Sequence, residues 1–407
     1  MTDLVRRQPD EAGALVRLGF DELRGFAESI ATTERDVAAR AFRYVPAGKP
    51  IRFVHDSVAR GVVGALGGAT TAAGRGAEAL VSRRPRSDRP LSATLPGGFG
   101  LAVLNGLIGD RLEREDSPLQ EPMSVRVGGF AVPPERAALA RAFARATGRL
   151  VVFVHGLMGE EHGWRLGVRR GRLDYGTRLA QERGFTPVYV RYNSGRHISE
   201  NGRSLADLMA AVVAEWPVDV DEVALVGHSM GGLVSRSACH CAALEEADWV
   251  GRVRHVISLG SPHMGAPLEQ AAHMASYAAN LLPETRMFST FLRRRSSGIR
   301  DLRQGSLVDE DWRDRDPEAL RAAACQEVPL LEGATHCFVS ATVTRSARHP
   351  LGRVIGDTLV LTNSASGRSR TRKLGFQDEY GLHVGATNHI ALLNHPAVYD
   401  KLHAWLR

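Results

Sequence analysis

The sequence predicts an α/β protein with a mostly parallel sheet covered by helices, a helical lid insertion and a helical N-terminal extension. Strand-like and helix-like segments alternate from about residue 120 to the end. One strand-like segment runs directly into a glycine-flanked serine and then a helical segment. Alternation of this kind is typical of parallel sheets whose crossovers are helices. The 407 residues are long enough for this domain and a further unit.

The strand predictions rest on short runs rich in apolar and β-branched residues. Residues 150–154, Leu-Val-Val-Phe-Val, have no polar side chain, which is typical of a strand buried on both faces. The other predicted strands are 123–127, 187–191, 222–226, 255–259, 337–342 and 382–385. Helical segments are expected between most of them, for example at 204–216 and 233–247.

The first third of the chain lacks this alternation of strand-like and helix-like segments and has a helical pattern. Apolar residues recur at helical spacing between residues 12 and 30, and the segment 52–82 is rich in glycine and alanine. Residues 82–96 read as a linker, and 101–108 as the start of another apolar helix. We therefore divide the chain into a helical extension, 1–115, and an α/β domain, 116–407, within which 264–334 form the lid.

Composition narrows the functional classes. Hydrophobic residues make up 43% and charged residues 24%, as in ordinary globular proteins. The net charge of +7 comes mainly from scattered arginines, since only three of the 52 basic residues are lysines, so we expect no nucleic-acid partner. Four cysteines do not make a disulfide framework. The absence of an apolar signal region and of a membrane-length apolar run favours a cytoplasmic location.

The strongest chemical signal is a serine on a turn between a predicted strand and a predicted helix. The segment is Gly227-His228-Ser229-Met230-Gly231. A nucleophilic serine needs a tight, strained turn that lifts its hydroxyl above the sheet, and the flanking glycines let helix and strand approach each other. The strand before the motif and the helix after it make Ser229 the predicted nucleophile.

A second turn follows the strand 150–154 and reads His155-Gly156-Leu157-Met158-Gly159. Attack on a carbonyl creates an oxyanion that two backbone N–H groups must stabilise. We expect these groups to be the N–H of Met230, directly after the serine, and that of Leu157. Residues around these turns would contact the substrate, and they are His155, Gly156, Met158, His228 and Trp164.

These motifs resemble those of α/β-hydrolases of the bacterial lipase and esterase type, including relatives of deacylases that act on lipid anchors. The third matching segment is Gly260-Ser261-Pro262-His263-Met264-Gly265, which resembles the Gly-Thr-Pro-His-x-Gly of these lipases. The resemblance spans roughly residues 120–407 and implies an α/β-hydrolase fold. It also implies the chain order serine, acid, histidine for a catalytic triad.

The acid is predicted to be Asp357. The segment Gly356-Asp357-Thr358-Leu359-Val360 resembles the family's Gly-Asp-x-Leu-Val, with Thr358 where glycine is usual. A buried carboxylate orients the imidazole and stabilises its cation. Asp316, Asp378 and Glu379 are the competing candidates.

The base is predicted to be His389, on the loop before the last helix. Its surroundings resemble the family's His-x-x-Leu-Leu ending. His383 falls in the predicted terminal strand, and His395 precedes Pro396, at the expected start of the last helix.

Two further groups invite a metal interpretation. Cys239, His240 and Cys241 are consecutive on a predicted helix, so their side chains diverge and do not share one ion. Asp378 and Glu379 alone are weak grounds for a calcium site. We therefore expect no metal and no organic cofactor.

The predicted function is that of a serine carboxylic-ester hydrolase acting on a small-molecule or lipid acyl ester. A thioesterase, a polyester depolymerase and an acyltransferase share the same triad and remain open. From another class, the chain could be a catalytically idle module that binds lipid surfaces. The N-terminal helices or the lid would make any peripheral lipid contact, and the oligomeric state is not indicated.

Overall fold

The computed structural model describes residues 11, 14, 90–168, 172–266, 295–316, 325–346, 348–369 and 372–407. Apart from residues 11 and 14, the segments within residues 1–85 where helices are predicted lie outside these ranges, as do residues 267–294 and 317–324 of the predicted lid. By its contacts the chain divides into two compact units. The unit that contains the sheet consists of Ser92–Arg114, Gln120–Gln270 and Ser296–Arg407. Residues 92–114, which the sequence placed in the N-terminal extension, thus belong to the sheet unit.

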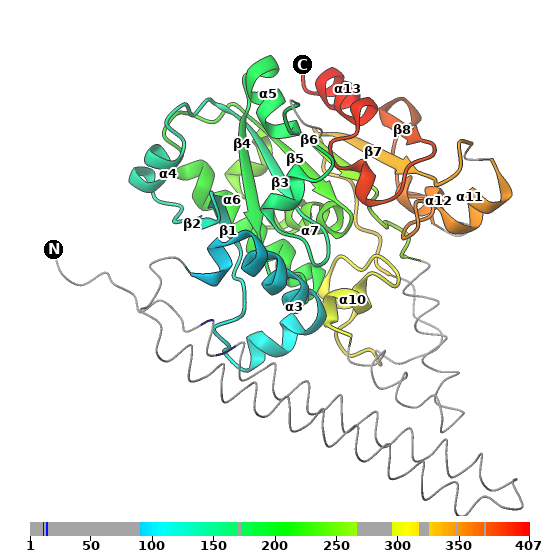
Figure 1. The fold of residues 1–407 in the computed structure, drawn as a ribbon, viewed down its shortest axis with the longest axis horizontal. Helices are drawn as coiled ribbons and strands as arrows, with labels where there is room; N and C mark the ends of the chain where they lie inside the picture. Colours follow the sequence, from blue (N-terminus) through cyan, green and yellow to red (C-terminus); the bar gives the residue numbers. More distant parts are fainter. Residues whose placement is uncertain are drawn as a thin grey trace, which may run out of the picture. The chain divides into compact units, whose positions relative to one another are not determined.

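The sheet unit is built around an eight-stranded sheet with the order β2-β1-β4-β3-β5-β6-β7-β8 (Figure 1). Strands β3 to β8 pair in parallel with one another, whereas β1 pairs antiparallel with both β2 and β4. The strands are β1 (Ser124–Val127), β2 (Phe130–Val132), β3 (Arg149–Val154), β4 (Thr186–Arg191), β5 (Glu222–His228), β6 (Val253–Leu259), β7 (Thr335–Ala341) and β8 (Gly381–Val384). The predicted α/β-hydrolase architecture is thereby confirmed, and β2 is the strand that the sequence did not indicate.

The helices lie between the strands in the order that parallel crossovers require. The α-helices are α3 (Leu95–Arg114), α4 (Arg136–Ala142), α5 (Tyr175–Arg183), α6 (Ile198–Ala214), α7 (Met230–Leu244), α10 (Ser297–Asp301), α11 (Pro350–Ile355), α12 (Thr362–Ala365) and α13 (Pro396–Trp405). The 3-10 turns are η2 (Leu91–Ala93), η3 (Glu161–Arg165), η4 (Asp248–Arg252), η6 (Asp309–Asp311), η7 (Asp378–Tyr380) and η8 (Ile390–Leu392).

The apolar residues of the central strands divide between two cores, one on each face of the sheet. On β3, Val152 and Val154 join the core formed with α6 and α7. Val151 and Phe153 join the core formed with α5 and α13. Successive side chains of a strand point to opposite faces, so a run without polar residues feeds both cores. Burial on both faces explains why the apolar run 150–154 predicted this strand correctly.

The parallel strands end at one edge of the sheet, and the loops that follow them carry every predicted catalytic residue. Ser229 directly follows β5, and the turn that begins at His155 directly follows β3. Asp357 lies between β7 and β8, and His389 lies between β8 and α13. Sites in open α/β sheets form at this edge because side chains from separate loops converge there.

No helix in the described ranges combines the length and the hydropathy that a membrane span requires.

Candidate active site

Ser229 occupies a strained turn between β5 and α7. Its φ is 54° and its ψ is −122°, a conformation that a residue with a side chain adopts only when its surroundings impose it. The N–H of Ser229 donates to Leu259 O at 2.8 Å, and Ser229 O accepts from Gly232 N at 3.1 Å. These bonds to the next strand and the following helix hold the turn. The half-buried hydroxyl thus lies at the start of α7, as the motif predicted.

The flanking glycines are required by close packing of backbone on backbone. A Cβ on Gly227 would overlap the backbone of Gly231 and Gly232, and one on Gly231 would overlap Val154 O and His155 O. The helix that follows the serine can therefore approach β3 only with glycine at these positions. This is the physical basis of the Gly-x-Ser-x-Gly pattern in this chain.

Asp357 and His389 form a buried pair. His389 Nδ1 lies 2.7 Å from Asp357 Oδ2, and the two residues are 2% and 1% exposed. The backbone N–H of His389 also donates to Asp357 O at 2.8 Å. Asp357 Oδ1 accepts from the N–H groups of Leu359 (3.0 Å) and Val360 (2.8 Å). One carboxylate oxygen is thus fixed by backbone donors, and the other is directed at the imidazole.

The second ring nitrogen of His389 has no partner. His389 Nε2 is buried and forms no hydrogen bond with any residue that the structure describes, including Ser229. The imidazole packs against Gly260, whose neighbour Leu259 accepts the hydrogen bond from Ser229. With Nδ1 donating to the carboxylate, Nε2 carries the free lone pair of a neutral imidazole.

The competing candidates are engaged elsewhere. His383 on β8 contacts the hydroxyls of Ser340 and Thr342, and His395 accepts from Ala397 N at the start of α13. Asp378 forms an exposed ion pair with Arg368. Asp316 and Glu379 are also exposed. Among the late acids and histidines of the described ranges, the buried pair consists of the two residues that the sequence singled out.

The turn after β3 is held by His155. Its ring is 3% exposed, lies 4.2 Å from the ring of Tyr192 and stacks on it. His155 Nδ1 lies 2.8 Å from Gly156 O, and Nε2 lies 3.2 Å from Tyr192 N. Because a carbonyl only accepts and an amide only donates, Nδ1 carries the proton and Nε2 accepts. Burial lowers the pKa of His155 to about 4. Both ring nitrogens therefore hold the turn, and contact between His155 and a substrate stays a prediction.

Leu157 and Met230 each present a backbone N–H near the serine. Met230 is the first residue of α7, where N–H groups lack acceptors within the helix. The N–H of Leu157 donates no hydrogen bond within the described ranges. Gly156 lies against the serine, since a Cβ on it would be 2.9 Å from Ser229 Cβ.

Met158 links this turn to two segments that the sequence did not connect with the site. Its N–H donates to the hydroxyl of Ser194, which is 1% exposed and follows β4. Its side chain lies against Gly106 of α3, where a Cβ would overlap it. Asn193 Nδ2 also donates to Gly109 O of the same helix. The glycines of α3 thus let the helix pack directly on the loops after β3 and β4, a role that no short motif signals.

His228 and Trp164 form a buried layer behind His389. His228 Nε2 lies 3.1 Å from His389 O, and the two rings lie 4.7 Å apart. The indole of Trp164 meets His228 edge-on, with the ring centroids 6.3 Å apart. His228 is 6% and Trp164 2% exposed. Burial, and then the nearby His389, lower the pKa of His228 to about 3. These contacts give both residues a packing role around the base.

A network around Arg191 supports the same region. Arg191 ends β4 and is fully buried. Its Nε and Nη2 lie 2.5 and 2.6 Å from the two carboxylate oxygens of Glu161. Its Nη1 lies 2.8 Å from both Glu121 Oε1 and Ser92 O, and Glu160 Oε2 is 3.3 Å from Nη2. The sequence carried a signal for this network, because a charged residue ends an otherwise buried strand and two adjacent glutamates follow the neighbouring strand.

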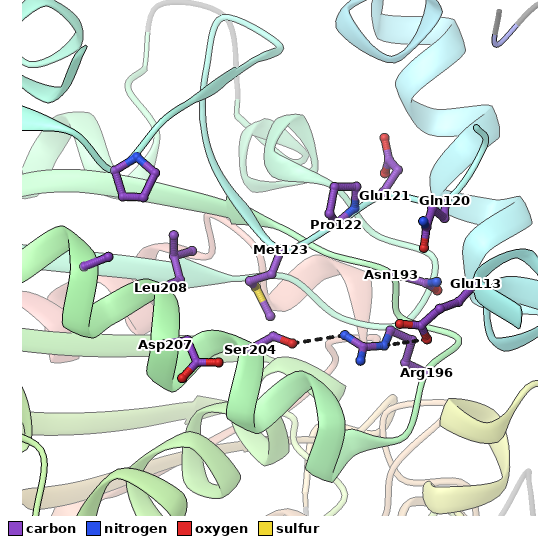
Figure 2. A pocket seen from close by; sticks show the side chains of 12 residues that line it. Glu113, Gln120, Glu121, Pro122, Met123, Asn193, Arg196, Ser204, Asp207 and Leu208 are labelled. Carbon is purple, nitrogen blue, oxygen red and sulfur yellow. Dashed lines mark hydrogen bonds and ion pairs between the residues drawn. The ribbon is translucent and has the colours of Figure 1, made fainter. Parts of the chain in front are cut away.

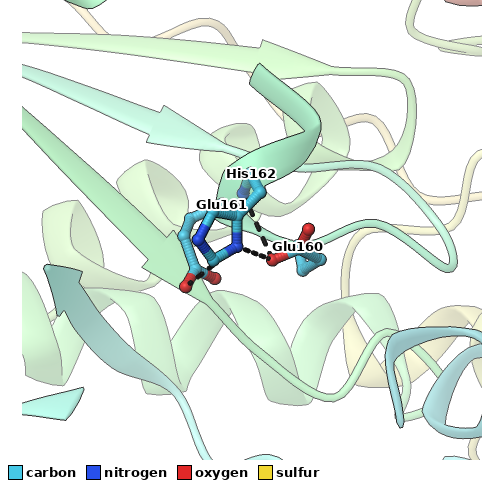
Figure 3. Close-up of side chains that lie close together, drawn as sticks. All are labelled: Glu160, Glu161 and His162. Atoms are coloured by element: carbon cyan, nitrogen blue, oxygen red, sulfur yellow. Dashed lines mark hydrogen bonds and ion pairs between the residues drawn. The ribbon is translucent and has the colours of Figure 1, made fainter. Parts of the chain in front are cut away.

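Glu160, Glu161 and His162 bring potential metal ligands within 4.8 Å of one another (Figure 3). Both oxygens of Glu161 already accept from Arg191, and Glu160 Oε2 lies 2.6 Å from His162 Nδ1. The guanidinium charge of Arg191 opposes a second cation at the same carboxylates. The side chains present therefore suit an ion network better than a metal centre.

A pocket of about 420 Å³ borders the loop after β4, where Asn193 lines it (Figure 2). The residues that line it include Glu113, Met123 and Arg196, and none of the predicted site residues is among them. The guanidinium of Arg196 pairs with Glu113 at 2.8 Å and donates to the Ser204 hydroxyl at 3.0 Å. These three polar groups satisfy one another, whereas Glu121, which also lines the pocket, has one carboxylate oxygen, Oε2, that is buried without a hydrogen-bond partner.

Comparison with known proteins gives a family match for the central region of the chain. Residues 145–312 match the family model described as a PGAP1-like alpha/beta domain. No curated protein matches the chain. Among solved structures, the Bacillus licheniformis lipase BlEst2 in its propeptide form is 18% identical over 70% of this chain and 52% of its own, with a TM-score of 0.41. This chain therefore spans about half the length of that lipase.

Two other solved structures show similar values. The Pyrobaculum calidifontis esterase is 14% identical over 81% of this chain and 96% of its own, with a TM-score of 0.38. The Staphylococcus hyicus lipase is 15% identical over 64% of this chain and 92% of its own, with a TM-score of 0.35. Identities and TM-scores of this size carry no inference about the chemistry of this chain, which depends on its own residues. The sheet order and the serine turn after β5 show that the chain has the α/β-hydrolase fold, as its motifs predicted.

Proposed function

We propose that the protein hydrolyses carboxylic esters through Ser229, His389 and Asp357. The observation that carries the proposal is the buried Asp357–His389 pair, whose outer nitrogen, His389 Nε2, is buried and unpartnered. An imidazole oriented by a carboxylate at Nδ1 and open at Nε2 is arranged to accept a proton. The loop that carries it packs on Gly260, next to the residue that holds Ser229.

In the proposed reaction His389 Nε2 removes the proton of Ser229 Oγ as the oxygen attacks the ester carbonyl. The carbonyl oxygen becomes an oxyanion, which the N–H groups of Met230 and Leu157 stabilise. His389 then donates its proton to the leaving alcohol, and an acyl-enzyme remains on Ser229. Water attacks this ester with His389 again as the base, and the carboxylic acid leaves. The bond between Ser229 Oγ and Nε2, absent in the free protein, forms when substrate is bound.

Asp357 has two tasks in this scheme. Its contact with Nδ1 fixes the tautomer that leaves Nε2 free, and its charge stabilises the imidazolium that forms during attack. The two backbone N–H groups on Oδ1 keep the carboxylate from turning away. The bond from His389 N to Asp357 O positions the backbone of the two loops as well.

The substrate is proposed to be an acyl ester with an apolar acid part. Leu157 and Met158 are partly exposed in the turn after β3, directly after the Gly156 that lies against Ser229. The lid predicted at 264–334 would complete the acyl site, and it stays a prediction because 267–294 and 317–324 lie outside the described residues. The same holds for lipid contact through the N-terminal helices.

A fluorophosphonate probe tests the nucleophile. We expect the probe to label the wild-type protein with a stoichiometry of one and to leave Ser229→Ala unlabelled. Ser235→Ala is the matched control, because Ser235 is fully buried on the same helix and its hydroxyl donates to Gly231 O. Labelling that persists in Ser229→Ala, or a wild-type protein that is not labelled, would contradict the proposal and favour an idle binding module.

A series of p-nitrophenyl esters from acetate to palmitate tests the substrate class. We expect kcat/KM to rise as the acyl chain lengthens beyond acetate, because each buried methylene adds apolar contact. Activity confined to acetate would rule out the apolar acyl site while leaving the nucleophile in place.

A further inference from the structure

His228 connects the strand of the proposed nucleophile with the loop of the proposed base. It is the last residue of β5 and directly precedes Ser229. His228 pairs in register with Leu259 of β6, and the N–H of Ser229 donates to Leu259 O at 2.8 Å. The main chain of both residues is therefore fixed by the sheet, and the side chain of His228 extends from a rigid support.

The side chain of His228 donates a hydrogen bond to the base loop. His228 Nε2 lies 3.1 Å from His389 O. A carbonyl oxygen only accepts, so Nε2 carries the ring proton and donates. The ring of His228 also lies 4.7 Å from that of His389, at an interplanar angle of 47°. The residue beside the nucleophile thus contacts both the main chain and the imidazole of the base.

The Asp357–His389 pair comes from the other side of β6. Asp357 follows β7 and His389 follows β8, and β6 separates these strands from β5 in the sheet. Two hydrogen bonds tie the pair together, one from the N–H of His389 at 2.8 Å and one at its Nδ1 at 2.7 Å. These bonds set the geometry of the pair but not its distance from Ser229. The bond from His228 joins the pair to β5.

The ring of His228 is itself held by two further residues. The indole of Trp164 meets it edge-on, and Trp164 is 2% exposed. Gly156 lies beside Nδ1, since a Cβ on that glycine would be 3.3 Å from the nitrogen. An apolar side chain would pack here equally well, whereas burying an imidazole costs free energy unless its polar groups are hydrogen-bonded. The bond to His389 O gives a reason for histidine at this position.

We propose that His228 is a positioning residue that sets the distance between Ser229 Oγ and His389 Nε2. The inference rests on the proposed hydrolysis, since this distance matters only if His389 takes the serine proton. Proton transfer requires the two atoms to approach to about 2.6–3.2 Å. A displacement of about 1 Å can cost about 100-fold in rate. Without the N–H of His228, the base keeps Asp357 but loses its hydrogen bond to β5.

The charge state of His228 suits this role. Burial, and then the charge of His389, lower the pKa of His228 to about 3. The ring therefore stays neutral near pH 7, with its one proton on Nε2. A neutral ring adds no repulsion when His389 becomes an imidazolium during attack. A lysine or arginine could donate to the same carbonyl, but its charge would oppose that step.

His228→Met and His228→Gln form a matched pair of variants, because the two side chains have the same length and only glutamine carries an N–H donor. In His228→Met we expect kcat for a p-nitrophenyl ester to fall about 10- to 100-fold, with KM changed less than about threefold. His228→Gln should restore kcat to within about threefold of the wild type. Should methionine prevent folding, His228→Asn gives the same comparison, because its shorter amide does not reach His389 O.

His336→Met separates positioning from loss of packing. His336 is 7% exposed, against 6% for His228, and its Nε2 likewise lies 3.2 Å from a backbone carbonyl, Leu331 O. It lies near the amino end of β7, away from the loops that carry the proposed triad. Both methionine variants should lose a similar amount of stability in urea, but only His228→Met should lose kcat. Equal losses of kcat in the two, or no rescue by glutamine, would overturn the positioning role.

Nitrogen-15 NMR of histidine-labelled protein tests the hydrogen bond without any activity. We expect one Nε2–H resonance that is protected from solvent exchange at pH 7 and is lost in His228→Gln. A wild-type spectrum in which His228 carries its proton on Nδ1 would overturn the bond and the proposal with it. A wild type that hydrolyses no ester and takes no fluorophosphonate label would overturn the proposed hydrolysis and the positioning role together. An active wild type with unchanged kcat in His228→Met would overturn the positioning role alone.

Discussion

Two buried charged groups lie at the carboxyl edge of the same sheet, and they differ in whether they are complete. The Arg191 network is closed at its guanidinium, which meets three carboxylates and a carbonyl; both oxygens of Glu161 are used, and only Glu121 Oε2 has no partner among the described residues of the network. The Asp357–His389 pair is open, because His389 Nε2 is buried without a partner. Burial and charge alone therefore do not distinguish a candidate reactive group from a structural one. The distinguishing feature here is an unused hydrogen-bonding position, His389 Nε2, on a side chain that a carboxylate orients.

The pKa values of the closed network follow from its geometry. Burial disfavours the charged form of Glu161, but the hydrogen bonds and charge of Arg191 outweigh it and hold the pKa below its usual range. Glu121 shares one oxygen with Arg191 and leaves the other unpaired, and burial there raises the pKa. One arginine therefore stabilises its bidentate partner fully and its more distant partner only in part.

The largest expected effect comes from changing the open pair. In Asp357→Asn the amide oxygen can keep the N–H groups of Leu359 and Val360, which directs the amide NH₂ at His389 Nδ1. The imidazole must then accept at Nδ1 and carry its proton on Nε2, where it cannot act as a base. We expect kcat to fall about 10³- to 10⁴-fold with little change in Tm. Asp378→Asn is the exposed control, and equal losses in both variants would contradict the assignment.

Breaking the closed network should affect stability first. Arg191→Met leaves buried carboxylates without their counter-charge, and losing one partner of a buried ion network costs about 3–5 kcal/mol. Urea denaturation should show this loss, whereas Arg254→Met, at an exposed arginine, should change the free energy of unfolding by less than about 0.5 kcal/mol. A stable Arg191→Met protein with strongly reduced kcat would reverse the roles proposed for the two groups.

A buried neutral histidine borders each group: His155 lies near the Arg191 network, and His228 lies against His389. Their burial predicts that the folded state loses stability in acid. The pKa of an unfolded histidine is near 6.5, and burial lowers it to about 4 for His155 and about 3 for His228. The unfolded chain therefore binds protons first, so stability is complete above pH 6.5 and falls as the pH falls toward 4. At pH 5 each histidine should cost about 2 kcal/mol.

Urea denaturation at pH 7 and pH 5 measures this difference, and His228→Gln should reduce it relative to the wild type. An unfolding free energy that is equal at the two pH values would contradict the burial of both rings.

The smallest effect is expected at the hydroxyl that supports the oxyanion turn. Ser194→Ala removes the acceptor of Met158 N and should lower the free energy of unfolding by about 0.5–1.5 kcal/mol. Because the turn carries Leu157 N–H, we also expect kcat to fall more than KM changes. Thr186→Ser, which keeps a hydroxyl at a buried position on β4, is the control. If Ser194→Ala lowers the free energy of unfolding but leaves kcat unchanged, the hydrogen bond has no role in catalysis.

How far the site could be predicted depends on the range of the interactions involved. Ser229 was predictable because the constraint is local: β5, the turn and α7 are consecutive, and only glycine allows their backbones to pack. The same holds for the strands, whose apolar runs feed both cores. The motifs could rank Asp357 and His389 above the competing acids and histidines. The contact between the two depends on loops that lie 32 residues apart in sequence.

The architecture and the candidate nucleophile follow from local interactions, because periodicity, turn chemistry and close backbone packing act between neighbours in the chain. Which polar groups find hydrogen-bond or charge partners depends instead on how distant segments pack. Arg191 finds its carboxylates on segments 30 and 70 residues away, and α3 reaches the turn after β3 through glycines that no short pattern marks. Burial raises the energetic cost of an unpaired charge, and burial arises only when distant segments pack together.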